Sequence, residues 1–148
     1  MGNWTKQYDI IKTELSKKNI DITNVKNAHI VPYIYNMEEI MNLSDIIVAR
    51  SGAMTITEIS NLGKPSILIP LPNVSQDHQL YNAKVLENIG AAKIILNNEL
   101  NKDNLNAEIE KIAKDPKLMK QMGEKALLKS VKDVPDKIYK EIKKIVKK

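Results

Sequence analysis

The residues whose types and spacing are best suited to bind a ligand lie at 49–60, in the stretch ARSGAMTITEIS. Small residues, Ser51-Gly52-Ala53, follow an apolar run and precede what reads as a helix. The backbone N–H groups of Gly52, Ala53 and Met54 would point outward at the helix start, where the helix dipole also favours a negative charge. This spacing predicts a turn that binds a diphosphate.

Thr55 and Glu58 extend this predicted site into the first turns of the helix. The Thr55 hydroxyl can add a donor, and the Glu58 carboxylate can accept from two neighbouring hydroxyls, as a ribose offers. The same spacing, Thr55-x-x-Glu58, also fits a capping box, in which the glutamate bonds back to the cap N–H. The residue chemistry leaves both interpretations open.

A second polar stretch, NVSQDHQLYNA at 73–83, precedes and begins another predicted helix. Gln79 and Asn82 are three residues apart and share one face, where their amides can bind sugar hydroxyls. The alternative is a polar first turn with Ser75 or Asp77 as its N-cap.

The two histidines give no sign of a catalytic site. His78 follows Asp77 directly, and adjacent residues of a helix point in different directions, so we interpret His78 as a surface or binding residue. His29 opens an apolar run and is interpreted as structural. No metal-ligand cluster is visible, and the absence of cysteine excludes a disulfide or thiolate site. We therefore assign no catalytic residue and no metal ligand.

The elements that must position these residues alternate along the chain. Apolar runs predict parallel strands near 29–33 (within AHIVPYI, 28–34), 45–49, 66–70 and 92–96. Amphipathic segments predict helices at 4–18, 37–43, 55–62, 77–89, 102–114, 116–130 and 135–147. Gly63 is the expected left-handed cap of one helix, and Asp115-Pro116 the start of another.

Such alternation indicates an α/β fold, a Rossmann-like parallel sheet with helices on both faces and ligands at the carboxyl ends of its strands. The chain opens with a helix where such a fold normally opens with a strand, so we expect its first strand to be missing. The unpaired edge predicts self-association. We interpret 1–148 as a single, partial nucleotide-sugar-binding domain, with a core motif region at 28–96 and C-terminal helices at 97–148.

Composition and charge narrow the class further. The 148 residues carry a net charge of +5, no cysteine and no apolar run of membrane-spanning length, so a cytoplasmic setting is expected. Residues 111–148 hold thirteen lysines against five acidic residues, a net +8, which leaves −3 for the rest. This basic segment is either a solvated face or a surface for anionic lipid. Without a basic-aromatic platform, no nucleic-acid partner is expected.

The combined motifs resemble one family. The run RSGAMT at 50–55, with Glu58, Gly63-x-Pro65, Pro70, PNVSQDHQLYNA and GAAKII, is similar to the C-terminal half of MurG-type N-acetylglucosaminyltransferases. These peripheral enzymes of the cytoplasmic membrane face have the GT-B fold. They move GlcNAc from UDP-GlcNAc to undecaprenyl-pyrophosphoryl-MurNAc-pentapeptide, which converts lipid I to lipid II in peptidoglycan synthesis.

The resemblance implies a role for each matching position. The backbone of Ile34 would bind uracil, and Glu58 the ribose. Gln79, with His78 and Asn82 near it, would face GlcNAc. The residues of the turn that would hold the diphosphate or admit it closely are Ser51, Gly52, Ala53, Met54 and Thr55. No cofactor is implied beyond the donor substrate.

The family's N-terminal domain, which carries the lipid-acceptor site and the proposed base, has no counterpart in this sequence. The resemblance therefore implies a donor-binding half, truncated at its N-terminus and inactive alone. The alternative is a naturally short sugar-nucleotide-binding subunit that acts only with a separate membrane-anchored partner.

Overall fold

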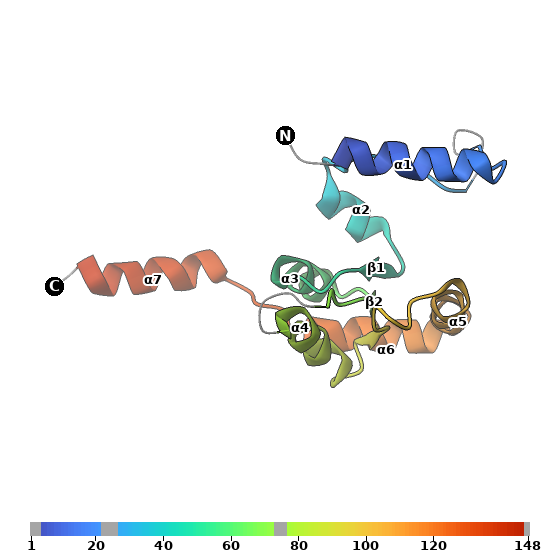
Figure 1. Cartoon of the computed structure of the whole chain (residues 1–148). Coiled ribbons are helices and arrows are strands. Elements are labelled where there is room, and N and C mark those ends of the chain that lie inside the picture. Colours follow the sequence, from blue (N-terminus) through green and yellow to red (C-terminus); the bar gives the residue numbers. More distant parts are fainter. Residues whose placement is uncertain (1–3, 22–26, 73–76, 147–148) are drawn as a thin grey trace. The chain divides into compact units, whose positions relative to one another are not determined.

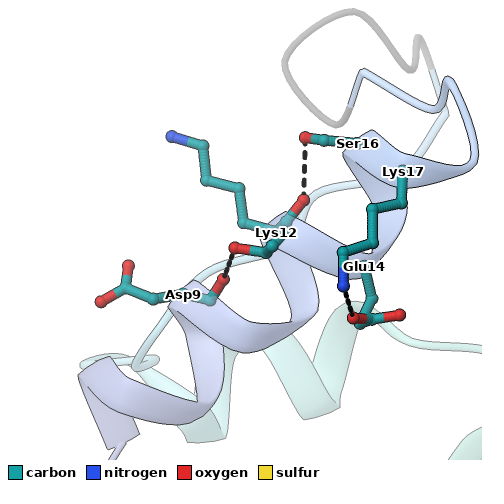
Figure 2. Close-up of polar contacts among 6 residues, drawn as sticks. Asp9, Lys12, Glu14, Ser16 and Lys17 are labelled. Carbon is teal, nitrogen blue, oxygen red and sulfur yellow. Dashed lines mark hydrogen bonds and ion pairs between the residues drawn. The ribbon is translucent and has the colours of Figure 1, made fainter.

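The computed structural model describes residues 4–21, 27–72 and 77–146 (Figure 1). It divides into two compact units, Met1–Met37 and Glu38–Lys148. The first unit contains helix α1 (Trp4–Lys17). Local polar contacts line this helix: the Ser16 hydroxyl donates to the Lys12 carbonyl at 2.9 Å, and Lys17 pairs with Glu14 at 2.7 Å (Figure 2).

The predicted first strand at 28–34 is wrong, because these residues adopt no regular structure. Val31 and Tyr33 are 51% and 59% exposed, so the apolar run lacks the burial that would stabilise a strand. Pro32 in its middle has no N–H for a sheet ladder.

The second unit holds a parallel sheet in the order β1-β2-β3, where β1 is Ile47–Ala49, β2 is Ser66–Leu68 and β3 is Ala92–Ile94. Ile47 is in register with Ser66, which in turn is in register with Ala92. Each strand is shorter than predicted but lies inside its predicted range. The other elements of this unit, with α2 beginning at the boundary, are α2 (Met37–Leu43), α3 (Ala53–Leu62), α4 (His78–Glu87), α5 (Lys102–Ala113), α6 (Pro116–Leu127) and α7 (Val134–Val146).

Two hydrophobic clusters cover the two faces of this sheet. Leu68 packs with residues of α3 and α4, including Ile59 and Leu86. Its neighbour Ile67 points to the opposite face and packs with α5 and α6, through Ile112 and Met122. Figure 1 shows α3, α4, α5 and α6 around the labelled strands β1 and β2. The predicted Rossmann-like arrangement, with helices on both faces, is confirmed for the strands that the structure describes.

Helix boundaries follow local sequence signals. Gly63 closes α3 in the left-handed region, with φ of 62°, and Asp115 caps α6 by accepting from the Leu118 N–H at 2.9 Å. Gly123 of α6 packs on this end of α3: an added Cβ would lie 2.5 Å from the Gly63 carbonyl oxygen. Both predicted caps are confirmed.

Helix α7 differs from the other described helices because every one of its residues is exposed. Ile138, Ile142 and Ile145 are 55%, 52% and 76% exposed. They recur at the spacing that places them on one side of the helix. Among the described helices, none combines the length and the apolar character needed to cross a membrane.

Candidate functional site

The loops that follow the three strands are joined by one side chain. Arg50, directly after β1, donates from Nη1 to the Ile69 carbonyl at 3.0 Å and to Asn97 Oδ1 at 2.8 Å. Ile69 follows β2 and Asn97 follows β3, so Arg50 fixes the three strand ends to one another. Sequence reasoning placed Arg50 in the motif but missed this role, because Asn97 lies 47 residues away.

The two predicted binding stretches also meet. Ser51 is fully buried, and its hydroxyl donates to the Gln79 carbonyl at 2.7 Å. The Asn82 side-chain nitrogen donates to the Ser51 carbonyl at 3.1 Å. The turn before α3 and the first turns of α4 therefore form one hydrogen-bonded assembly.

The turn itself is open to a ligand. Gly52 is the N-cap of α3 but supplies no side-chain cap, and the N–H groups of the first helical residues, Ala53, Met54 and Thr55, have no partner within the helix. Gly52 has φ of −63°, which any residue can adopt, and among the described residues an added Cβ would meet only the Thr55 hydroxyl at 4.0 Å. Folding alone does not require glycine here.

Glu58 is half-buried and lines a cavity of about 190 Å³ with Glu38, Met41, Asn61 and Leu62. The proposed capping box is wrong, because α3 begins at Ala53 and not after Thr55. Thr55 is consequently the third helical residue, and Glu58 forms no hydrogen bond or ion pair with the described residues. Its carboxylate is available to a ligand in the cavity.

At the start of α4, the Gln79 side-chain oxygen accepts from the Leu71 N–H at 3.0 Å. This contact leaves the Gln79 amide nitrogen without a partner among the described residues. Asp77 takes the N-cap position with φ of 53° but makes no side-chain cap bond, and Ser75 lies outside the described residues. His78 is exposed.

A second cavity, of about 240 Å³, lies between the loops after β2 and β3. Its lining includes Leu71, Leu80 and Leu96, with Asp77, Asn97 and Asn98 as polar groups. Sequence reasoning missed it, because its walls come from separate loops. The Asn-Asn pair that follows the last strand was the available signal.

The predicted uracil contact lies in the other compact unit. Ile34 belongs to the first unit, so its role in binding uracil stays a prediction. Within the ranges that the structure describes, no group of three or more histidine, aspartate or glutamate residues is arranged to hold a metal ion.

A parallel sheet with helices on both faces and an open helix start at its carboxyl edge defines a Rossmann-like ligand-binding domain. Residues 6–138 match the glycosyltransferase family 28 C-terminal domain, and the chain belongs to this family. The resemblance to MurG-type enzymes is thereby confirmed.

The names of similar proteins agree with this family assignment. A UDP-N-acetylglucosamine–N-acetylmuramyl-(pentapeptide) pyrophosphoryl-undecaprenol N-acetylglucosamine transferase of Thermoanaerobacter sp. (strain X514) is 39% identical over 139 residues, or 94% of this chain and 38% of the relative. The protein of the same name from Ruminiclostridium cellulolyticum is 43% identical over 142 residues, or 95% of this chain and 38% of the relative.

The crystal structure of Acinetobacter baumannii MurG superposes with a TM-score of 0.71 and 31% identity, covering 78% of this chain and 35% of that one. The chain thus spans little more than a third of the length of the proteins it matches.

Proposed function

We propose that this chain is the donor-binding domain of an inverting glycosyltransferase. The enzyme would move GlcNAc from UDP-GlcNAc to the lipid-linked MurNAc-pentapeptide, converting lipid I to lipid II in peptidoglycan synthesis. The observation that carries the proposal is the open turn at Gly52 beside the Glu58 cavity, in a chain 39% identical to a transferase of that name.

Each part of the donor has a candidate partner. The N–H groups at the start of α3 bind the diphosphate, and Glu58 in its cavity accepts from the ribose hydroxyls. Gln79 offers to GlcNAc its amide nitrogen, which has no partner among the described residues, and His78 is the adjacent residue. Binding of uracil by the backbone of Ile34, which belongs to the other compact unit, stays a prediction. As the glycosidic bond breaks, the helix start stabilises the charge that develops on the UDP leaving group.

The lipid-linked acceptor and the general base belong to another part of the enzyme in this proposal. The alternative of a short subunit with a separate partner is less favoured, because each relative carries the matching segment within a longer chain. We expect the purified chain to transfer no GlcNAc to a lipid-linked acceptor. Measurable transfer would refute the proposal that the acceptor site and the general base lie outside this chain.

The α7 helix supports attachment to the cytoplasmic face of the membrane. Its exposed isoleucines form an apolar stripe, and its opposite side carries Lys137, Lys140, Lys143 and Lys144 against only Asp136 and Glu141. A short helix with an apolar stripe and a lysine-rich face is suited to an anionic lipid surface.

The free edge of β1 supports self-association. In the described sheet β1 pairs only with β2, and Val48 at its centre is 41% exposed. Alternate peptide groups of a parallel strand face opposite neighbours, so the N–H and C=O of Val48 point away from β2. A second copy could pair there. Sedimentation at high concentration tests this proposal, and a clean monomer would contradict it.

Titration of the ¹⁵N-labelled chain with UDP-GlcNAc, UDP, UDP-glucose and ADP tests the donor assignment. We expect the uridine nucleotides to shift the amide resonances of Ala53, Met54 and Glu58, and ADP to leave them in place. Equal responses to UDP and ADP would contradict a uridine site, and no response to any ligand would refute the proposed function.

A further inference from the structure

We propose that Asn82 is a positioning residue that orients the peptide between Ser51 and Gly52, so that the Gly52 N–H faces the diphosphate. The inference rests on the proposed function and refines it. It replaces the role that the family resemblance implies for Asn82, a direct contact with GlcNAc, by a role exerted through the turn.

The argument begins with the acceptor of the Asn82 hydrogen bond. The side-chain nitrogen donates to the Ser51 carbonyl at 3.1 Å. This oxygen belongs to the same peptide group as the Gly52 N–H. Because the described chain contains no cis peptide bond, the planar group directs its C=O and its N–H in opposite directions. An oxygen held toward α4 therefore turns the Gly52 N–H away from α4.

A second contact with α4 restrains the residue that precedes this peptide. Ser51 is fully buried, and its hydroxyl is held by the Gln79 carbonyl at 2.7 Å. Rotation of the peptide would break the Asn82 contact and leave the Ser51 carbonyl without this donor. Among the described residues, only the Thr55 hydroxyl would come near a Cβ added at Gly52, at 4.0 Å, so no side chain of this residue stands between the turn and an approaching anion.

Hydrogen bonding at the carbonyl has a second effect on the donor. A donor at the C=O polarises the whole peptide group and strengthens the hydrogen bond that its N–H can form. Asn82 thus aligns and strengthens a donor that touches the diphosphate. Its remaining N–H and its oxygen could still reach a sugar, so the experiment must separate the two roles.

Affinities for UDP and UDP-GlcNAc separate the positioning role from a direct sugar contact, because only UDP-GlcNAc carries the GlcNAc group. We compare the full chain with Asn82→Ala and with Asn82→Asp, which keeps the size of the side chain but removes the donor. Asn88→Ala is the matched control: Asn88 ends the same helix, and its side chain makes no hydrogen bond with the described residues.

We expect Asn82→Ala to raise the dissociation constants of both ligands by the same factor, about fivefold, as the loss of one neutral hydrogen bond implies. Asn82→Asp should weaken both at least as much, because its carboxylate faces the Ser51 carbonyl, and Asn88→Ala should change neither. The amide resonance of Gly52 should move in both Asn82 variants even without ligand, and its response to UDP should shrink.

Four results would overturn the inference. A loss of affinity for UDP-GlcNAc alone would make Asn82 a sugar contact. Unchanged affinity for both ligands, or an unmoved Gly52 resonance in a folded variant, would remove the positioning role. If the unsubstituted chain binds neither ligand, the proposed function itself fails, and the inference fails with it.

Discussion

Replacing Glu58 by glutamine separates ligand binding from folding at the centre of the site. The side chain keeps its size but loses its charge. Because α3 starts at Ala53, Glu58 is the sixth residue of the helix and takes no part in its cap. It forms no hydrogen bond or ion pair with the described residues, so folding should barely depend on its charge.

The substitution should affect UDP binding much more than the stability of the fold. The free energy of unfolding should change by less than about 0.5 kcal/mol, the range for substitutions away from packing and caps. Binding of UDP should weaken by about 1–3 kcal/mol, because hydrogen bonds to a charged acceptor contribute that much. This loss corresponds to an increase of about 5-fold to 150-fold in the dissociation constant.

Calorimetric titration with UDP and chemical denaturation measure the two quantities on the same samples. Glu87→Gln is the matched control, since Glu87 is also half-buried and lies at the far end of α4. It makes the same change in net charge. If Glu58→Gln binds UDP as tightly as the unsubstituted chain, or more tightly because a negative charge near the diphosphate is gone, the ribose assignment is refuted.

Three further predictions use other parts of the fold. Thr55→Ala should lower the free energy of unfolding by only a few tenths of a kcal/mol, because Thr55 is not the N-cap of α3. Asp115→Ala should lower it by about 1 kcal/mol, because Asp115 caps α6, and denaturant titration compares the two variants. Gly123→Ala should destabilise by about 1–3 kcal/mol, because its Cβ would press on the Gly63 carbonyl 2.5 Å away, and an unchanged melting temperature would contradict this packing. Neutralising Lys140, Lys143 and Lys144 together should weaken binding to anionic vesicles by at most about 1 kcal/mol per lysine, in a salt-dependent manner; unchanged vesicle binding would remove the membrane role.

The parts of the fold that could be predicted from sequence are those fixed by local chemistry. The start of α6 follows from Asp115 and Pro116, and the end of α3 from the left-handed Gly63. The strands β1, β2 and β3 follow from short apolar runs, because strands of a parallel sheet with helices on both faces need no polar alternation. Each of these signals lies within a few residues of its consequence.

The failures occurred where a local pattern competed with a partner elsewhere. The run at 28–34 has the composition of a strand, but a strand also needs a neighbour, and its exposed side chains show that burial is missing. Thr55-x-x-Glu58 has the spacing of a capping box, but the helix begins earlier, at Ala53. Composition and spacing cannot decide where the first helical hydrogen bond forms.

In the candidate site, too, local features could be predicted and contacts between distant residues could not. The positions of the turn and of Gln79 could be predicted from two short motifs. Their connection could not, because it consists of contacts such as Ser51 to Gln79, 28 residues apart, and Arg50 to Asn97, 47 residues apart. Nor could sequence reveal that Asn82 faces a backbone carbonyl instead of open space.

Glycine at position 52 finally distinguishes a structural requirement from a functional one. Gly63 has a positive φ, and an added Cβ would lie 2.7 Å from Leu127, while Gly123 presses on a neighbouring backbone; folding explains both residues. At Gly52 the backbone is ordinary, and the part of the chain that the structure describes leaves room for a Cβ. A side chain there would not disturb the fold, but it would stand in front of the N–H groups that the turn presents. Close approach of a ligand is therefore the physical reason that the structure offers for this glycine, and it supports the proposal that the diphosphate binds at the start of α3.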